Sequence, residues 1–202
     1  MRTYKIDNMY WLGLFVLLMS HLSQAQGKSQ LALRIGLNNA KIIQTDLHTK
    51  QGLYAGLALS VKLSDTYVLQ PELGYSRQGG ASENNNTDDI NINYISIGLT
   101  NKFFTKNHGF HFMLGPSIAV NYDDNILYLT NNTAENFKLT PVDLNLMGGV
   151  GVQFSSGLGI ELRYKQGLID LDFNDNGAYG SSAEKAQLNK VVQIGIYYGL
   201  KF

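Results

Sequence analysis

From Gln26 onward, the chain repeats one pattern about eight times, in which apolar and polar residues alternate with a period of two. A β-strand turns successive side chains to opposite faces, so this period predicts strands with one apolar and one polar face. The first example, over residues 29–38, reads SQLALRIGLN, with an apolar residue at every odd position from Leu31 to Leu37. The pattern therefore predicts an all-β fold.

The lengths of the connections alternate as regularly as the strands do. The predicted strands cover residues 29–38, 53–62, 67–76, 94–104, 110–122, 142–154, 158–168 and 188–202. The connections are short at 64–66, 105–109 and 155–157, and long near 39–50, 79–90, 123–140 and 170–187. Outer-membrane barrels have short periplasmic turns, longer extracellular loops and an even number of strands. We expect an eight-stranded antiparallel up-and-down transmembrane barrel; a hairpin over residues 126–139 would make ten strands.

The N-terminal segment predicts export. Arg2 and Lys5 precede an apolar run over residues 9–19, and Ser23-Gln24-Ala25 places small residues before a cleavage point. The apolar run is about half the roughly 20 residues that a transmembrane helix needs. The expected organisation is a signal peptide over residues 1–25 and an outer-membrane barrel domain over residues 26–202.

The polar face of the predicted strands carries charges of both signs. They are Arg34, Lys62, Glu72, Lys102, Asp143, Glu161, Arg163 and Lys165. An Arg or Lys that faces lipid at the bilayer midplane costs about 2–4 kcal/mol. In a membrane this face must therefore point inward, where opposite charges can pair. We predict that these residues form an interior charge network, with the apolar face in lipid.

Aromatic residues mark both ends of the apolar face and the end of the chain. Tyr67 and Phe103 lie toward the short turns, and Tyr75 and Tyr122 toward the long loops, as in the two interfacial girdles of a barrel. The last strand finishes with apolar residues at every second position and resembles the C-terminal signal of outer-membrane barrels. The predicted membrane-insertion signal is Tyr198, Leu200 and Phe202. Pro71 and Pro116 lack a donor for the strand ladder, so we expect a bulge at each.

Several short segments of the mature chain match a known family. They are QPELGYSRQGG from Gln70, Tyr94-Ile95-Ser96-Ile97, Leu114-Gly115-Pro116, Asp143 before a Gly-rich strand, and Arg163-Tyr164. They resemble the PorT-like outer-membrane β-barrel family of Bacteroidetes, a porin family with OmpA/OmpX-like barrel architecture. Family members include a factor associated with gliding and type IX secretion. The resemblance implies outer-membrane lipid and the barrel assembly machinery as partners, with envelope or secretion proteins as further candidates.

The long loops contain weak candidates for a metal site and for catalysis. Asp172, Asn174 and Asn176 match the first half of a calcium loop, but its twelfth position is Ala183. An external loop rich in Asp, Asn and Gly needs no metal to explain it, so we predict no cofactor. Asp46 with His48, and His108 with His111, lack a partner placed for acid/base or nucleophilic chemistry. We therefore expect a protein that is not an enzyme.

The overall charge excludes some functions and leaves three hypotheses. Sixteen basic residues balance sixteen acidic ones without a basic run, so nucleic acid is not an expected partner. The first hypothesis is a structural, envelope-assembly or partner-binding barrel. The second is a narrow porin for small solutes, although eight strands leave an interior that side chains nearly fill. The third is a soluble periplasmic barrel, like a lipocalin, that turns its apolar face inward onto a ligand.

Overall fold

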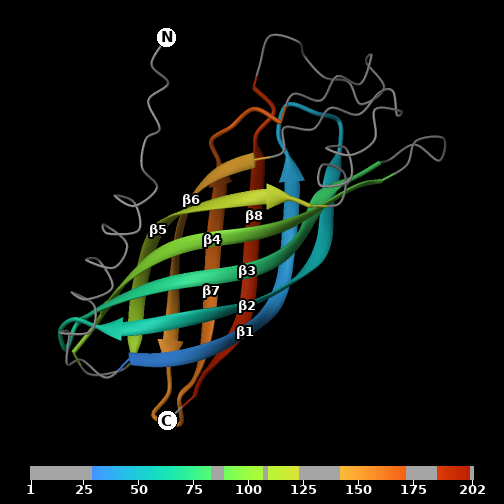
Figure 1. The fold of residues 1–202 in the computed structure, drawn as a ribbon. Coiled ribbons are helices and arrows are strands. Elements are labelled where there is room, and N and C mark those ends of the chain that lie inside the picture. The colour runs from blue at the N-terminus through green and yellow to red at the C-terminus, as the bar shows by residue number, and fades with distance from the viewer. Residues whose placement is uncertain (1–28, 83–88, 107–108, 123–141, 172–185, 201–202) are drawn as a thin grey trace, which may run out of the picture.

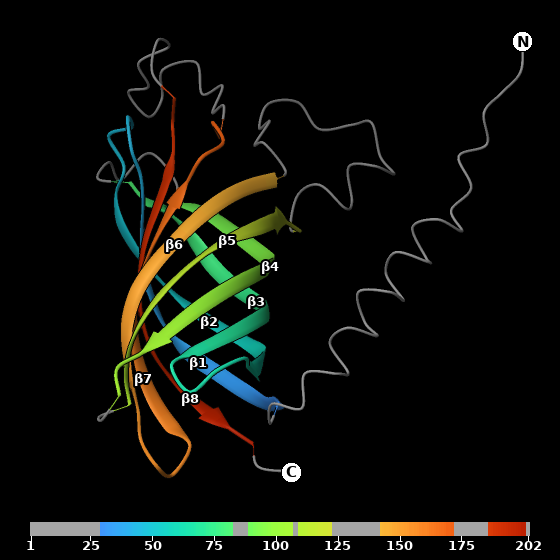
Figure 2. The ribbon, with the colours of Figure 1, turned by 90° about the vertical axis from the view of Figure 1, so that its left-hand side faces the viewer.

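The computed structural model describes residues 29–82, 89–106, 109–122, 142–171 and 186–200, which form one closed antiparallel barrel (Figures 1 and 2). Its strands are β1 (Ser29–Ile42), β2 (His48–Lys62), β3 (Tyr67–Ala81), β4 (Ile90–Phe104), β5 (Phe110–Asn121), β6 (Val142–Gln153), β7 (Leu158–Gly167) and β8 (Asn189–Gly199). Each strand pairs with the next, and β1 closes against β8 from Ala32↔Gly199 to Ile42↔Asn189. The predicted eight-stranded barrel is confirmed.

Two of the predicted features lie outside the described residues. They are the signal peptide over residues 1–25 and the hairpin over residues 126–139. Among the residues that are described, no helix is long and apolar enough to cross a membrane.

A belt of apolar side chains surrounds the barrel. It includes Leu33, Leu57, Leu73, Ile97, Leu114, Ile118, Leu146, Ile160 and Ile196, all between 43% and 68% exposed. On β3 the belt runs from Tyr67 to Tyr75, close to the 9–11 residues that a tilted strand needs to cross a bilayer. Tyr67 stacks on Phe103 with 5.3 Å between ring centroids, and Tyr75 lies 6.2 Å from Tyr122. The apolar face therefore points outward, with an aromatic pair at each edge.

Beyond the outer edge of the belt, the strands continue with the opposite polarity. The last outward apolar pair between β1 and β2 is Leu37↔Leu53, and the next outward pair is Asn39↔Gln51. Between β3 and β4, Tyr75↔Ile95 is followed by Arg77↔Asn93. We call this part the outer extension; its outward side chains are polar, and its inward ones include Ala40, Ile42, Ile90 and Ile92.

The outer extension corrects the predicted loops. Residues 39–50 are not a long loop, because β1 and β2 continue through them and only residues 43–47 connect the strands. Thr45 Oγ1 helps to close this connection by donating a 2.9 Å hydrogen bond to the Ile42 carbonyl. Likewise, β3 extends to Ala81 and β4 begins at Ile90. The shift from odd to even apolar positions, which suggested a loop, marks a change of environment along a continuous strand.

The two prolines do not produce the expected bulges. Pro71 pairs with Leu99 on β4, and the β2–β3 register is the same on either side of it, at Ala58↔Glu72 and Val61↔Leu69. Pro116 pairs with Leu146 on β6, and the β4–β5 register is likewise unchanged across it. Each proline therefore interrupts pairing on one side only. The register shift between β2 and β3 lies instead between Thr49 and Tyr54.

Candidate functional site

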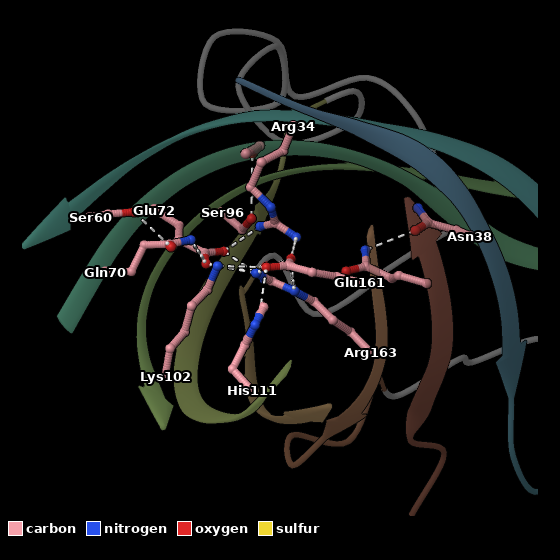
Figure 3. Close-up of polar contacts among 12 residues, drawn as sticks. Arg34, Asn38, Ser60, Gln70, Glu72, Ser96, Lys102, His111, Glu161 and Arg163 are labelled. Atoms are coloured by element: carbon pink, nitrogen blue, oxygen red, sulfur yellow. Dashed lines mark hydrogen bonds and ion pairs between the residues drawn. The ribbon is translucent and has the colours of Figure 1, made fainter. Parts of the chain in front are cut away.

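The barrel interior is the candidate site, and an ion cluster occupies its centre (Figure 3). The ion cluster consists of Arg34 on β1, Glu72 on β3, Lys102 on β4, and Glu161 and Arg163 on β7. All five residues lie on the polar face of their strands, which the barrel turns inward. Because β3 and β7 are four strands apart in the closed order, the cluster joins opposite walls.

Two carboxylates hold the ion cluster together. Glu72 Oε2 lies 2.6 Å from Arg34 Nη1 and 2.8 Å from Arg163 Nη1. Glu161 Oε2 lies 2.7 Å from Arg163 Nη2 and 3.1 Å from Arg34 Nη2. Lys102 Nζ donates a 2.6 Å hydrogen bond to Glu161 Oε1. Each carboxylate thus neutralises at least two cations from different strands.

The surroundings of the ion cluster make it a closed polar network. Lys102, Glu161 and Arg163 are 3% exposed or less. Gln70 Nε2 donates a 2.8 Å hydrogen bond to Glu72 Oε1, and Ser60 Oγ donates one of 3.1 Å to Gln70 Oε1. Burying an ion costs several kcal/mol, which pairing and hydrogen bonds of this kind offset. The charges are therefore already engaged with one another.

An aromatic floor lies between the ion cluster and the short turns. The buried His111 ring is 4.6 Å from the Phe104 ring, and its Nε2 lies 3.5 Å from Glu161 Oε1. Lys102 Nζ lies 4.4 Å from the centroid of the Tyr197 ring, in a cation–π contact. The Tyr197 ring packs directly over Gly159, where any Cβ would collide with it. Large rings and a facing glycine therefore fill this end.

An amide layer lies on the other side of the ion cluster. Gln193 Nε2 donates to Asn38 Oδ1, and Asn38 Nδ2 donates to Ser76 Oγ, both at 2.8 Å. Gln78 Nε2 donates a 2.8 Å hydrogen bond to Ser76 Oγ, and Asn189 Nδ2 donates to Gln78 Oε1. Side-chain amides carry donors and acceptors together, so such a chain pairs most of its polar atoms away from water; Asn189 Oδ1 has no partner among the described residues. The layer links β8, β1 and β3.

An apolar cap closes the outer end of the interior. It consists of Ile42, Leu47, Ile90, Ile92, Tyr94, Ala119 and Leu171. Ile42 and Leu171 are 0% exposed, and Ile92 and Tyr94 are 1% exposed. Most of these residues lie inside the outer extension, where the inward face has become apolar, and Ala119 lies at its border with the belt. From the short turns outward, the interior is thus filled by the aromatic floor, the ion cluster, and then the amide layer and the apolar cap. The last two overlap, because Gln78 pairs with Ile92 and Asn189 pairs with Ile42.

One residue of the predicted charge network lies elsewhere. The Lys62 side chain is 50% exposed, and its Nζ lies 2.8 Å from Asp65 Oδ1 at the short-turn rim. This hydrogen bond holds the pKa of the Asp65 carboxyl below its ordinary value. The expectation that Lys62 belongs to the interior network is wrong, because β2 ends at this residue and its side chain reaches solvent.

The remaining predicted network residues are buried but separate from the ion cluster. Asp143 is 0% exposed and Lys165 is 8% exposed. Neither forms an ion pair with another described residue. Of the predicted insertion signal, Tyr198 lies on the outer face and is 47% exposed, and Phe202 lies outside the described residues.

Most of the weak candidates for a metal site or catalysis lie where the structure describes no residues. Asp172, Asn174, Asn176 and His108 lie outside the described residues, within which no group of His, Asp and Glu is placed to hold a metal. Asp46 and His48 are exposed near the β1–β2 connection. Sequence reasoning missed His111 and Gln70 as neighbours of the ion cluster. The alternation in the sequence places both side chains on the inward face. Which carboxylate each one contacts depends on the stagger between strands, which the alternation does not give.

Comparisons with known proteins agree with this geometry. The family model of the outer membrane protein beta-barrel domain matches residues 23–172. No curated protein matches the chain. Among solved structures, Neisserial surface protein A is similar with a TM-score of 0.50 and 14% identity, covering 84% of this chain and 96% of that one. Ail of Yersinia pestis, solved with the heparin analogue sucrose octasulfate, has a TM-score of 0.50 and 13% identity, covering 86% and 99%.

Proposed function

Since the chain belongs to the outer membrane protein beta-barrel domain family, we propose that it is a closed outer-membrane barrel that acts through its outer surface. The observation that carries this proposal is the filling of the interior by these four groups of side chains. Hydrogen bonds hold the cluster and the amide layer together internally, a cation–π contact joins the cluster to the floor, and the cap is buried apolar packing. A solute would have to break these contacts to pass.

Conductance separates this proposal from the narrow-porin hypothesis. Refolded protein inserted into planar lipid bilayers is expected to give no current steps above those of protein-free bilayers. A 16-stranded porin refolded in the same detergent is the positive control for insertion, because its lumen is an open aqueous channel. Reproducible steps from the wild-type chain would favour the porin and overturn the closed barrel.

The outward apolar belt opposes the soluble-barrel hypothesis. A lipocalin-like barrel needs its apolar face around a ligand, whereas Ile97 is 68% exposed and Ile35 is 56% exposed on the outside. Removing the belt from water requires lipid or detergent. Wild-type protein is therefore expected in the detergent-solubilised outer-membrane fraction, and recovery from the periplasm without detergent would contradict this assignment.

We infer that the partner-binding surface is the outside of the outer extension. Its polar side chains, including Asn39, Gln51 and Asn91, stand clear of the lipid belt on continuous strands. The resemblance to PorT-like barrels supports envelope-assembly or secretion proteins as the class of partner. The last strand, with Tyr198 and Leu200, is the segment that we propose for recognition by the barrel assembly machinery.

Photo-crosslinking in cells tests this surface. A photoreactive residue at Gln51 is expected to capture an envelope protein, whereas the same residue at Ile97 is expected to capture lipid. Both residues are exposed and both point outward. Gln51 lies in the outer extension, whereas Ile97 lies in the belt. Equal protein capture at the two positions would contradict the assignment of the outer extension.

A further inference from the structure

Lys165 is a buried cation that forms no ion pair with any residue the structure describes. Its side chain projects inward from β7 and is 8% exposed. No hydrogen bond or ion pair joins it to another described residue, although Arg163, two residues earlier on the same face, forms both. A buried ammonium group is costly unless an anion or several acceptors satisfy it. Among the described residues, Lys165 thus lacks the paired anion or hydrogen-bond acceptors that would satisfy its ammonium group.

A small cavity lies directly against Lys165. It has a volume of about 40 Å³ and is lined by Arg34, Arg163, Lys165, Glu72, Gln193 and Ser117, among others. Arg34 Nε and Ser117 Oγ are buried and have no hydrogen-bond partner in the part of the chain that the structure describes. Cationic and hydroxyl donors thus meet around a small, partly open space between the ion cluster and the amide layer.

The charges around the cavity do not balance. Arg34, Lys102 and Arg163 are three cations against the carboxylates of Glu72 and Glu161. Both oxygens of Glu72 are already engaged, Oε2 by two guanidinium groups and Oε1 by Arg163 and Gln70. Lys165 adds a fourth cation. With Asp143, the other buried carboxylate of the inward face, the sum among these residues is four cations against three carboxylates.

We propose that this cavity binds one small inorganic anion, of the size of chloride, held by Lys165 and by the free N–H group of Arg34. A water molecule occupies roughly 10–15 Å³ on this measure of volume, so the cavity holds a monatomic anion with a water molecule. An organic acid or a sugar sulfate would not fit. The anion balances a positive charge inside the barrel. It also joins β1, through Arg34, to β7, through Lys165.

Anion-dependent stability tests the proposal. Protein refolded in an uncharged detergent is melted in mixtures of sodium chloride and sodium gluconate at constant ionic strength. The midpoint of unfolding is expected to rise as chloride replaces gluconate and then to level off, because gluconate is too large for the cavity. Bromide is expected to replace chloride with the same effect. A midpoint that does not depend on the chloride fraction would overturn the proposal.

Matched lysine variants identify the site. Lys165→Met is expected to remove the chloride dependence, since it keeps the long side chain and deletes the charge. Lys190→Met changes a lysine whose side chain points outward on β8, and it is expected to keep the wild-type dependence. A chloride dependence that survives in Lys165→Met, or that disappears equally in both variants, would contradict the assignment.

Diffraction from crystals that contain bromide tests the site in the wild-type protein, so no variant has to fold. Crystals of the wild-type protein grown in sodium bromide are expected to show an anomalous peak inside the barrel, within hydrogen-bond distance of Lys165 Nζ. Anomalous peaks confined to the outer surface would overturn the proposal.

Discussion

The two halves of β4 show how one strand serves two environments. From Ile95 to Phe103 the outward residues are apolar except Asn101, and the inward ones include Thr100 and Lys102. From Ile90 to Tyr94 the apolar side chains point inward, and Asn91 points outward. The strand pairs with β3 in one register throughout. The backbone is the same in both halves, so the solvent outside decides which face must be apolar.

The largest expected effect comes from removing a buried charge inside the part of the barrel that the belt surrounds. Glu161→Ala would leave Lys102 and Arg163 buried without their shared carboxylate, so the free energy of unfolding should fall by about 3–5 kcal/mol. Urea titration of protein refolded into lipid vesicles measures the change. Asp65→Ala, which breaks the exposed pair with Lys62, is the control and should leave stability unchanged. Equal losses would mean that burial of the ion cluster carries no energetic weight.

Two isoleucines on β4 compare the halves directly. Ile92 is 1% exposed in the apolar cap and Ile97 is 68% exposed in the belt. Ile92→Ala should cost about 2–5 kcal/mol because it opens a cavity in a packed core. Ile97→Ala should cost less, because lipid chains can close over the smaller side chain. The same titration measures both, and a larger loss at Ile97 would reverse the roles of the two halves.

A lysine scan along β2 sharpens the position of the boundary. Leu57→Lys places a charge in the middle of the belt and should cost about 2–4 kcal/mol. Leu53→Lys, at the edge, should cost less, and Gln51→Lys, in the outer extension, should leave the free energy of unfolding unchanged. A uniform cost along the three positions would show that lipid continues past Gln51.

The smallest expected effect concerns pH at the outer extension. Lys50 Nζ donates a 3.0 Å hydrogen bond to Asp89, and this bond with one from the Ser82 N–H lowers the pKa of Asp89. A lowered folded-state pKa adds stability above the unfolded value of about 3.9, and this stability is lost as the pH falls through the folded value. NMR titration of the Asp89 carboxyl should give a midpoint below the ordinary value.

Lys50→Met is the control for this titration. The variant removes the hydrogen bond from the ammonium group and should move the Asp89 midpoint back toward the ordinary value. An Asp89 midpoint that is the same in wild type and Lys50→Met would show that the ion pair does not form in solution.

The sequence was sufficient for the belt but not for the outer extension. Period two located Leu33, Leu57 and Ile160 on one face, and the cost of charge in lipid decided that this face points outward. The same period missed Ile90 and Ile92, because their phase is opposite to that of Ile95 and Ile97. A change of phase within a strand indicates a loop or a bulge as readily as a change of solvent, and only the unbroken register distinguishes them.

The contents of the interior were predictable, but their partners were not. Arg34, Glu72 and Arg163 share the inward phase with Lys62, yet Lys62 lies at the rim because β2 ends there. Which charges meet depends on the stagger of the strands around the barrel, a property of closure that no single strand encodes. Asp143 and Lys165 share the inward phase but do not join the ion cluster, for the same reason.

The ion cluster also has a consequence for the order of assembly. Glu72 and Arg163 are separated by 91 positions in the chain and lie on opposite walls. While the sheet is still open, these side chains remain far apart and hydrated, so the early hairpins gain nothing from them. Their attraction acts when the last strands curl round to meet the first. The Glu72–Arg163 pair thus stabilises the closed barrel and not the open sheet, whereas the Arg34–Glu72 pair already joins β1 to β3.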